Sequence, residues 1–182
     1  MANVPSYDSS RYSFGPGIIY MGAEGTTPTI DIGSVKGDAE LSIERTRLEV
    51  HQGSPQVKVA QYATKEEVIL KVTGIEWNLS NIAYAIGAGS TGSTGAVDTL
   101  EFGGAMTMNN RAIRFLHLQP DGSTIDIHLF KCEGAGALAM ALKETETHEF
   151  PYEFHVLRGT TDFEGSVLAA SKRLFKITRT RA

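Results

Sequence analysis

Histidine and cysteine side chains can bind metal ions or act in catalysis. The 182-residue chain has five histidines and one cysteine, which are far apart in the sequence. No two histidines have the HxH or HExxH spacing of a metal site, and Cys132 has no CxxC partner. A cysteine nucleophile needs a base and an orienting group. The sequence shows neither for Cys132, so a buried structural thiol is expected. Solvated or hydrogen-bonded side chains are also favoured over metal ligands at His51, His117, His128, His148 and His155.

Other signatures of catalysis or cofactor binding are missing from the sequence. Glycine pairs occur at residues 15–17 and 134–136, but neither belongs to a GxGxxG or P-loop motif that follows a strand and opens a helix. Glu66 and Glu67 are adjacent in a predicted strand, so their side chains point to opposite faces and are poorly placed as an acid–base pair. We therefore expect a protein that is not an enzyme and that binds neither cofactor nor metal.

The composition indicates one folded domain over residues 1–182, with 41% apolar and 21% charged residues. The formal net charge of −4 argues against a dedicated nucleic-acid binder, because such domains carry a basic excess. The basic end KRLFKITRTR is favoured as a solvated terminus over a phosphate-binding or acid-binding patch. The first residues lack a signal-peptide core, and no apolar run reaches the roughly 20 residues that span a bilayer. Synthesis in a cytoplasm without export is expected.

Residues 64–87 are the segment around which the rest of the chain is organised. The run VILKV alternates in polarity, which predicts a β-strand, and Gly74 then shifts the phase, which predicts a bulge. Asn78 is a good N-cap residue, and Gly87 stands where a left-handed C-cap belongs. A short helix between them is expected to pack on the sheet through Leu79, Ile82, Ala83 and Ile86.

Residues 38–73 are predicted to form three long strands, two of them joined as an extended hairpin. The apolar residues change parity between Ile43 and Leu48, so a bulge is expected near residues 45–47. Residues 51–55, with the sequence HQGSP, are a turn signal. Much of the segment is polar on both sides. An exposed hairpin of this length is a liability unless something pairs with it.

The remaining segments complete a mainly β pattern. A flexible arm is expected at residues 1–12, and the Gly/Ser/Thr-rich residues 88–96 are predicted to be a surface loop. Residues 135–142 fit either a strand or a helical turn. Further strands are predicted at residues 14–22, 29–33, 100–102, 111–118, 125–129, 150–156 and 174–178, with a tight turn at 120–123 and an edge or bulge at Pro151.

The predicted fold class is therefore an antiparallel β-sandwich or a strongly curved, barrel-like sheet of nine to eleven strands. One short α-helix packs on this sheet, and a long β-hairpin extends from it. The residues alone favour a structural or interaction protein over an enzyme.

Four stretches of the chain carry a resemblance to a known family. They are GPGIIYMGAEGTTPTIDIGSVKGD, ELSIERTRLEVHQGSPQVKVAQYATKEE, VILKVTGIEWNLSNIAYAIG and EFPYEFHVLRGTTDFEGSVLAASKRLFKITR. They cover most of the chain, and their order and spacing carry the comparison more than any single motif. In these stretches the chain resembles the major tail tube proteins of long-tailed, siphovirus-type bacteriophages, whose tails do not contract.

The resemblance implies the phage tail tube fold and a structural virion protein. Hexameric rings would stack into a tube, and each subunit would add strands to a β-barrel around the lumen through which genome DNA is ejected. The helix would lie outside that barrel, and the long hairpin would reach the next ring. The implied partners are further copies of this chain and the tape measure, terminator and distal tail proteins. Assembly would occur in the host cytoplasm, with no membrane binding by this chain.

Two groups of residues are candidates for roles in such a tube. An acidic or neutral lumen would let DNA slide, because it does not hold DNA by counterion release. The polar sides of well-patterned strands are candidates for the lumen wall, with bulk solvent as the alternative: Glu40, Ser42, Glu44, Asp126 and His128. The hairpin and the loop at residues 88–96 supply candidates for contacts between subunits or rings, with plain mobile loops as the alternative. The hairpin candidates are Arg45, Arg47, His51, Gln52, Gly53, Ser54 and Pro55.

Other functions remain open on the sequence. A tail terminator, or the tube of a contractile tail or secretion-type injection machine, would share the fold but differ in partners. A small-molecule-binding β-barrel would need an apolar interior on nearly every strand, which the polar faces of residues 40–67 oppose. A β-sandwich hydrolase would need a nucleophile and a base that the sequence does not show.

Overall fold

The computed structural model describes residues 17–182 except 38, 105–107, 136–137 and 141. These residues form antiparallel β-sheets with one α-helix, which confirms the predicted mainly β fold class. The arm expected at residues 1–12 lies outside the described residues. In chain order the elements are β1 (Ile18–Gly22), β2 (Ile30–Asp31), β3 (Glu40–Gln52), β4 (Val57–Gly74), α1 (Leu79–Ile86), β5 (Ser90–Thr94), β6 (Val97–Glu101), β7 (Arg111–Leu118), β8 (Thr124–Gly134), β9 (Phe150–Val156), the 3-10 helix η2 (Ala170–Lys172) and β10 (Phe175–Thr180).

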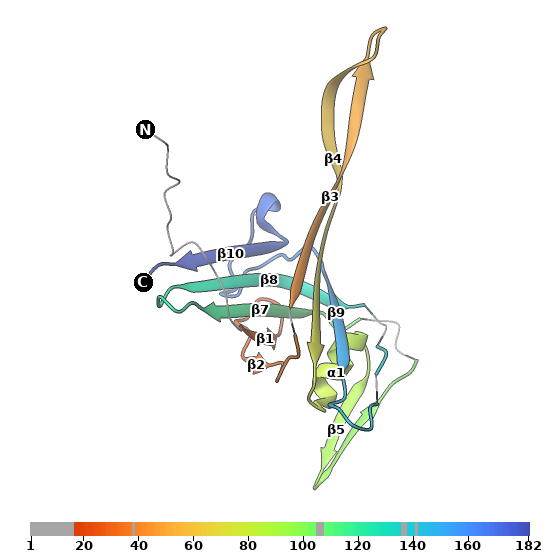
Figure 1. Ribbon diagram of the computed structural model, residues 1–182, viewed down its shortest axis with the longest axis vertical. Helices are drawn as coiled ribbons and strands as arrows, with labels where there is room; N and C mark the ends of the chain where they lie inside the picture. Colours follow the sequence, from red (N-terminus) through yellow and green to blue (C-terminus); the bar gives the residue numbers. More distant parts are fainter. Residues whose placement is uncertain (1–16, 38, 105–107, 136–137, 141) are drawn as a thin grey trace.

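Strand β8 organises an eight-stranded sheet with the order β2-β1-β7-β8-β9-β4-β3, in which β10 also pairs with β8. One edge of β8 pairs with β10 along residues 124–129 and with β9 along residues 132–134. The other edge pairs with β7. In Figure 1, β7, β8 and β10 lie across the molecule, whereas β3 and β4 rise steeply out of it. The sheet is therefore strongly curved, since adjacent strands add their twist.

The main hydrophobic core lies on one face of this sheet, where alternate residues of the strands meet. Helix α1 contributes to it, and Leu41 of β3 packs at its margin. Burial raises the pKa of the Cys132 thiol, which fits the expected structural role. The most deeply buried members of this core are Ile19, Met21, Val68, Ile82, Ile113, Leu129, Cys132, Phe150 and Phe154.

Helix α1 begins and ends as the sequence predicts. The Asn78 side chain accepts hydrogen bonds from the backbone N–H groups of Ser80 and Asn81, at 3.1 and 3.2 Å. Gly87 closes the helix with a φ of 76°, the left-handed conformation that glycine adopts without strain. These caps satisfy backbone groups that a helix of eight residues leaves unpaired at its ends.

The face of α1 that packs on the sheet carries the apolar residues predicted from the helical spacing in the sequence. It also carries one polar residue, Asn81. Asn81 is fully buried, and its Nδ2 donates a 2.8 Å hydrogen bond to the carbonyl oxygen of Ile32. This bond ties the helix to the chain just after β2. The four residues chosen from the sequence are buried or half-buried: Leu79, Ile82, Ala83 and Ile86.

The structure corrects the predicted long hairpin in two places. Two strands replace the expected three, because β4 runs without interruption for 18 residues. It ends at Gly74, and its register with β9 shows no bulge up to that residue. Residues 64–67, with the sequence TKEE, are polar and show no apolar alternation. In a ribbon exposed on both faces, however, the backbone bonds to β3 hold a strand without apolar alternation. The bulge expected near residues 45–47 is confirmed by the register shift between Thr46 and Arg47, and a second shift lies between Val50 and His51.

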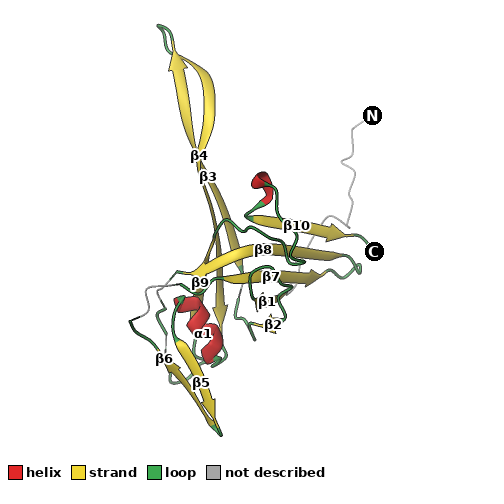
Figure 2. Ribbon diagram, turned by 180° about the vertical axis from the view of Figure 1, so that it is seen from behind, coloured by secondary structure: helices red, strands yellow, loops and turns green. Residues whose placement is uncertain are grey.

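The prediction of a loop at residues 88–96 is wrong. Strands β5 and β6 form a separate two-stranded antiparallel sheet, joined by a turn at Gly95 and Ala96. Gly95 has a φ of 63°, as the first central residue of a two-residue hairpin turn of type II′ requires. Figure 2 shows this hairpin beside α1. The low-complexity composition concealed it, because serine, threonine and glycine also favour flexible connectors.

Two smaller predictions are also resolved. Strand β9 lies between β4 and β8 and is not an edge strand, yet Pro151 falls outside the three β9 residues that pair with β8. Its missing N–H therefore costs no ladder bond on that side. The described residues among 135–142 belong to neither helix nor strand, because β8 ends at Gly134.

Gly134 allows α1 to approach the sheet closely. A Cβ at this position would stand 2.2 Å from the Ala85 carbonyl oxygen and 2.4 Å from that of Tyr84. Both atoms belong to the helix backbone, so neither can move alone. We expect Gly134→Ala to lower the free energy of unfolding by about 2–3 kcal/mol, as overpacked cores do. Urea unfolding followed by circular dichroism measures the change.

Gly92→Ala in the exposed strand β5 is the matched control. A Cβ there would meet a threonine hydroxyl at 3.0 Å, a side-chain atom that can turn away. Its effect is expected to stay within about 0.5 kcal/mol. Equal destabilisation by the two variants would contradict the close approach of helix and sheet.

Candidate assembly surfaces

The outer part of the β3–β4 hairpin extends away from the rest of the molecule. Strand β9 pairs only with residues 69–74 of β4, so beyond this point β3 and β4 pair with each other alone among the described residues. We call residues 44–67 the distal ribbon. In Figure 1 it projects well beyond every other element. Isolated two-stranded hairpins are marginally stable in water, so this ribbon depends on its continuation into the core.

One face of the distal ribbon is apolar. Leu48 pairs with Tyr62 and Val50 with Ala60, and residues directly opposite each other share a face. The side chains of Leu48 and Tyr62 are 56% and 61% exposed, so nothing in the subunit covers them. Large apolar side chains gathered on one exposed surface mark a site of protein contact.

The other face of the distal ribbon is charged. Lys58 forms an ion pair with Glu49, and His51 Nε2 lies 3.8 Å from Glu49 Oε2. Ion pairs at such exposed positions contribute little to stability. They do keep this face hydrated, so the two faces of the ribbon have different chemistry.

The predicted contact residues all lie on the ribbon or at its tip. Strand β3 ends at Gln52 and β4 begins at Val57, so the turn covers residues 53–56. Every one of these side chains is exposed, and Arg45 is paired with Glu66. The apolar face was not predicted from the sequence. The pattern that could have indicated it is Leu48 and Val50 on one face of β3 after the bulge, opposite Tyr62 and Ala60 of β4. The residues selected from the sequence are Arg45, Arg47, His51, Gln52, Gly53, Ser54 and Pro55.

Three of the lumen candidates lie together on the face of β3 that turns away from the core. Glu40, Ser42 and Glu44 alternate with Leu41, which packs against the core. Their partners on β4 are Lys71, Ile69 and Glu67. This face is therefore mainly polar and carries charges of both signs.

The other two lumen candidates, Asp126 and His128, lie on the corresponding face of β8 but are engaged within the subunit. Arg114 Nε lies 3.0 and 3.1 Å from the two carboxylate oxygens of Asp126, and Arg114 Nη2 donates a 2.7 Å bond. His128 Nε2 lies 3.1 Å from Asp126 Oδ1, and its ring stacks on Phe163 with centroids 4.2 Å apart. The segment carrying Phe163 therefore partly covers this pair, which sequence patterns did not indicate.

The Arg114 guanidinium and the Asp126 carboxylate stabilise each other's charged form. Partial burial opposes ionisation of Asp126, but hydrogen bonds from Arg114 and His128 outweigh it and lower the Asp126 pKa. The same bond raises the pKa of Arg114. A bidentate, partly buried pair of this kind fixes the register of β7 against β8 more firmly than an exposed pair would.

Among the described residues, β3 and β10 each have one edge without a strand partner, as do the short strand β2 and both strands of the β5–β6 hairpin. Among the described residues, β3 pairs only with β4, and β10 pairs only with β8. Both therefore present backbone N–H and C=O groups that have no strand partner. Such edges are templates for pairing with another chain.

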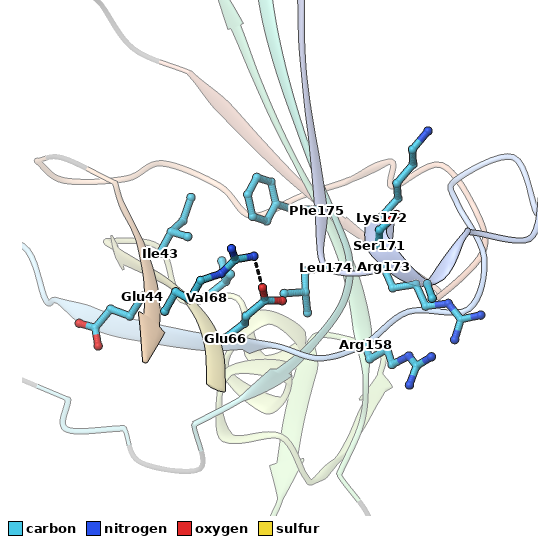
Figure 3. A pocket seen from close by; sticks show the side chains of 12 residues that line it. Ile43, Glu44, Glu66, Val68, Arg158, Ser171, Lys172, Arg173, Leu174 and Phe175 are labelled. Carbon is cyan, nitrogen blue, oxygen red and sulfur yellow. Dashed lines mark hydrogen bonds and ion pairs between the residues drawn. The ribbon is translucent and has the colours of Figure 1, made fainter. Parts of the chain in front are cut away.

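A groove of about 790 Å³ lies between the base of the distal ribbon and the segment from η2 into β10. Figure 3 shows Ile43, Val68, Leu174 and Phe175 around it, with basic side chains on the η2 side. The groove opens to solvent at the root of the ribbon and is a further candidate for contact.

A search against protein-family models found no match to this chain, and a search of curated proteins found none either. Within the described residues, no helix is long and apolar enough to cross a membrane. The same part of the chain holds no group of three His, Cys, Asp or Glu side chains arranged for a metal ion.

We expect Asp126→Asn to lower the free energy of unfolding by about 1–2 kcal/mol at neutral pH, because Arg114 loses its ionic partner. The folded-state pKa of Asp126 is depressed. Its stabilisation is therefore present above the unfolded value of about 3.9 and is lost as the pH falls through the folded value. The difference between wild type and variant should shrink below about pH 4.

Urea titrations over this pH range measure the difference. Asp98→Asn on exposed strand β6 is the control, because the described residues give Asp98 no ion pair. A deficit that stays constant down to acid pH would show that the Asp126 charge is not its cause.

Proposed function

We propose that this chain is a structural protein that assembles as stacked hexameric rings into the tail tube of a long-tailed, non-contractile bacteriophage. The tube would conduct genome DNA into the host cell during ejection. The observation that carries the proposal is the distal ribbon, a long projection with an uncovered apolar face. Its exposure is costly in a free subunit and is removed when another copy covers it.

The open edges of β3 and β10 support the same proposal. A sheet that ends in unpaired strands can continue into neighbouring copies and close as a barrel, which removes all edges. The elongated shape in Figure 1 also leaves the ribbon free to reach a copy in the adjacent ring. The resemblance in four stretches of sequence adds the number of copies per ring and the phage context.

The polar face of β3 supports a lumen wall for passing DNA. Glu40, Ser42 and Glu44 supply acidic and neutral groups. Lys71, opposite Glu40, is in an ion pair with Glu153. A wall without an unbalanced row of cations does not bind DNA by releasing counterions. We assign these three residues to the lumen. Asp126 and His128 are kept as proposed wall residues, and the Asp126 carboxylate is balanced by Arg114.

The test is negative-stain electron microscopy of the purified protein at high concentration, with its mass measured in solution. We expect hollow tubes, or rings with six-fold symmetry, and a mass that rises with concentration. A protein that stays monomeric at every concentration, and remains so when added to preformed tail components, would contradict the proposal.

Replacing the apolar pair by Leu48→Ser and Tyr62→Ser should abolish long tubes and leave the subunit folded. These side chains are exposed in the subunit, so their loss should change its stability by no more than about 0.5 kcal/mol. Electron microscopy and urea unfolding together measure both effects.

The matched control is Glu49→Ser with Gln61→Ser, the neighbouring pair on the charged face of the same ribbon. It should still form tubes. If both double variants polymerise equally well, the apolar face is not an assembly surface.

A further inference from the structure

The groove at the base of the distal ribbon is cationic. Its rim carries Arg158, Lys172 and Arg173, and the ion pairs found within the described residues include none of these three. The Arg173 Nε group donates a 3.1 Å bond to the Leu168 carbonyl oxygen, so this residue is fixed in place. In Figure 3 the side chains of Arg158 and Lys172 extend on the side opposite Glu44.

Acidic side chains do not neutralise this rim. Glu66 lines the groove but is paired with Arg45. Glu44 also lines it, yet it follows Ile43 on the strand and belongs to the opposite face of β3. The groove therefore combines an apolar wall, formed by residues such as Ile43 and Phe175, with an excess of positive charge.

The β5–β6 hairpin has the complementary chemistry. Residues 88–102 contain Asp98 and Glu101 and neither lysine nor arginine. Val97 and Glu101 are four residues apart on β6 and so share one face, and Val97 is 61% exposed. The other face of β6 turns inward through Leu100, which packs against the core. The outward face thus presents an apolar residue and a carboxylate together.

The groove and this hairpin lie on opposite sides of β8. In Figure 1 the β5–β6 hairpin is at the bottom, whereas η2 and the distal ribbon rise on the upper side of β8. One subunit therefore cannot satisfy its own groove. A contact between two different surfaces is heterologous, and when it does not close on itself it generates an open, growing assembly.

We infer that β6 of one subunit docks in the ribbon-base groove of a second copy of this chain. Glu101, on the outward face of β6, faces Arg158 and Lys172, and Val97 on the same face packs against the apolar wall. This contact rests on the proposed function and specifies how rings stack. It acts between rings, so rings form without it and tubes do not.

Charge reversal tests the contact. Glu101→Lys should leave rings of normal mass but lower the sedimented tube fraction by about tenfold or more, because it opposes like charges across the contact. Arg158→Glu with Lys172→Glu should have the same effect. A chain that carries all three changes restores opposite charges and should recover tubes. The matched control is Glu164→Lys, an exposed residue on a turn outside both surfaces, which should form normal tubes.

The outcomes separate this contact from the proposed function. Wild-type protein that forms no rings or tubes overturns the proposed function. Wild-type tubes that persist unchanged in Glu101→Lys overturn the contact alone. If each charge-reversed protein is folded and forms rings but the combined variant does not recover tubes, the pairing of these two surfaces is wrong.

Discussion

The unpaired length of the β3–β4 ribbon is the constraint on which the rest of this structure depends. From residue 68 of β4 toward the ribbon tip, the described residues give β3 and β4 no strand partner except each other. Each strand has one open edge, and the apolar face is exposed to water. A long exposed edge with apolar side chains is a hazard for a free subunit. Coverage by another molecule would remove this hazard, which is why we propose assembly.

The body of the molecule holds this ribbon in a fixed direction. Strand β4 enters the main core through Val68, Leu70 and Val72, so the ribbon continues a buried strand and is not a loop tethered at its ends. Helix α1 covers that core, and Gly134 allows it to sit against β8 without a gap. The Arg114–Asp126 pair fixes β7 against β8 on the other face. The body therefore fixes the root of the ribbon, whereas residues farther out are held by the two ribbon strands alone.

The sequence predicts those parts of the fold that local physics determines. Asn78 and Gly87 define the ends of α1 because caps act within one turn. The parity change between Ile43 and Leu48 reveals the bulge, since a bulge shifts every later side chain to the other face. Most strand positions follow from alternation in the same way.

Other features escape prediction because they depend on distant partners. Residues 64–67 continue a strand only because β3 lies beside them, and the β5–β6 hairpin resembles a linker in composition. The ring of Phe163 covers His128 from 35 residues away along the chain, and Asn81 finds its partner 49 residues away. No local pattern records such contacts. The assembly surfaces are also partly hidden, because their apolar residues become a contiguous face only after the register is known.

Hydrogen exchange at the backbone amides of the distal ribbon is the most direct test of the central claim. We expect rapid exchange along residues 44–67 in the free subunit, because a two-stranded ribbon opens readily. Strong protection of the same amides is expected in the assembled state, with the core strands protected in both. Assemblies in which the ribbon exchanges as fast as in the free subunit would contradict the account, because the ribbon would then have no partner.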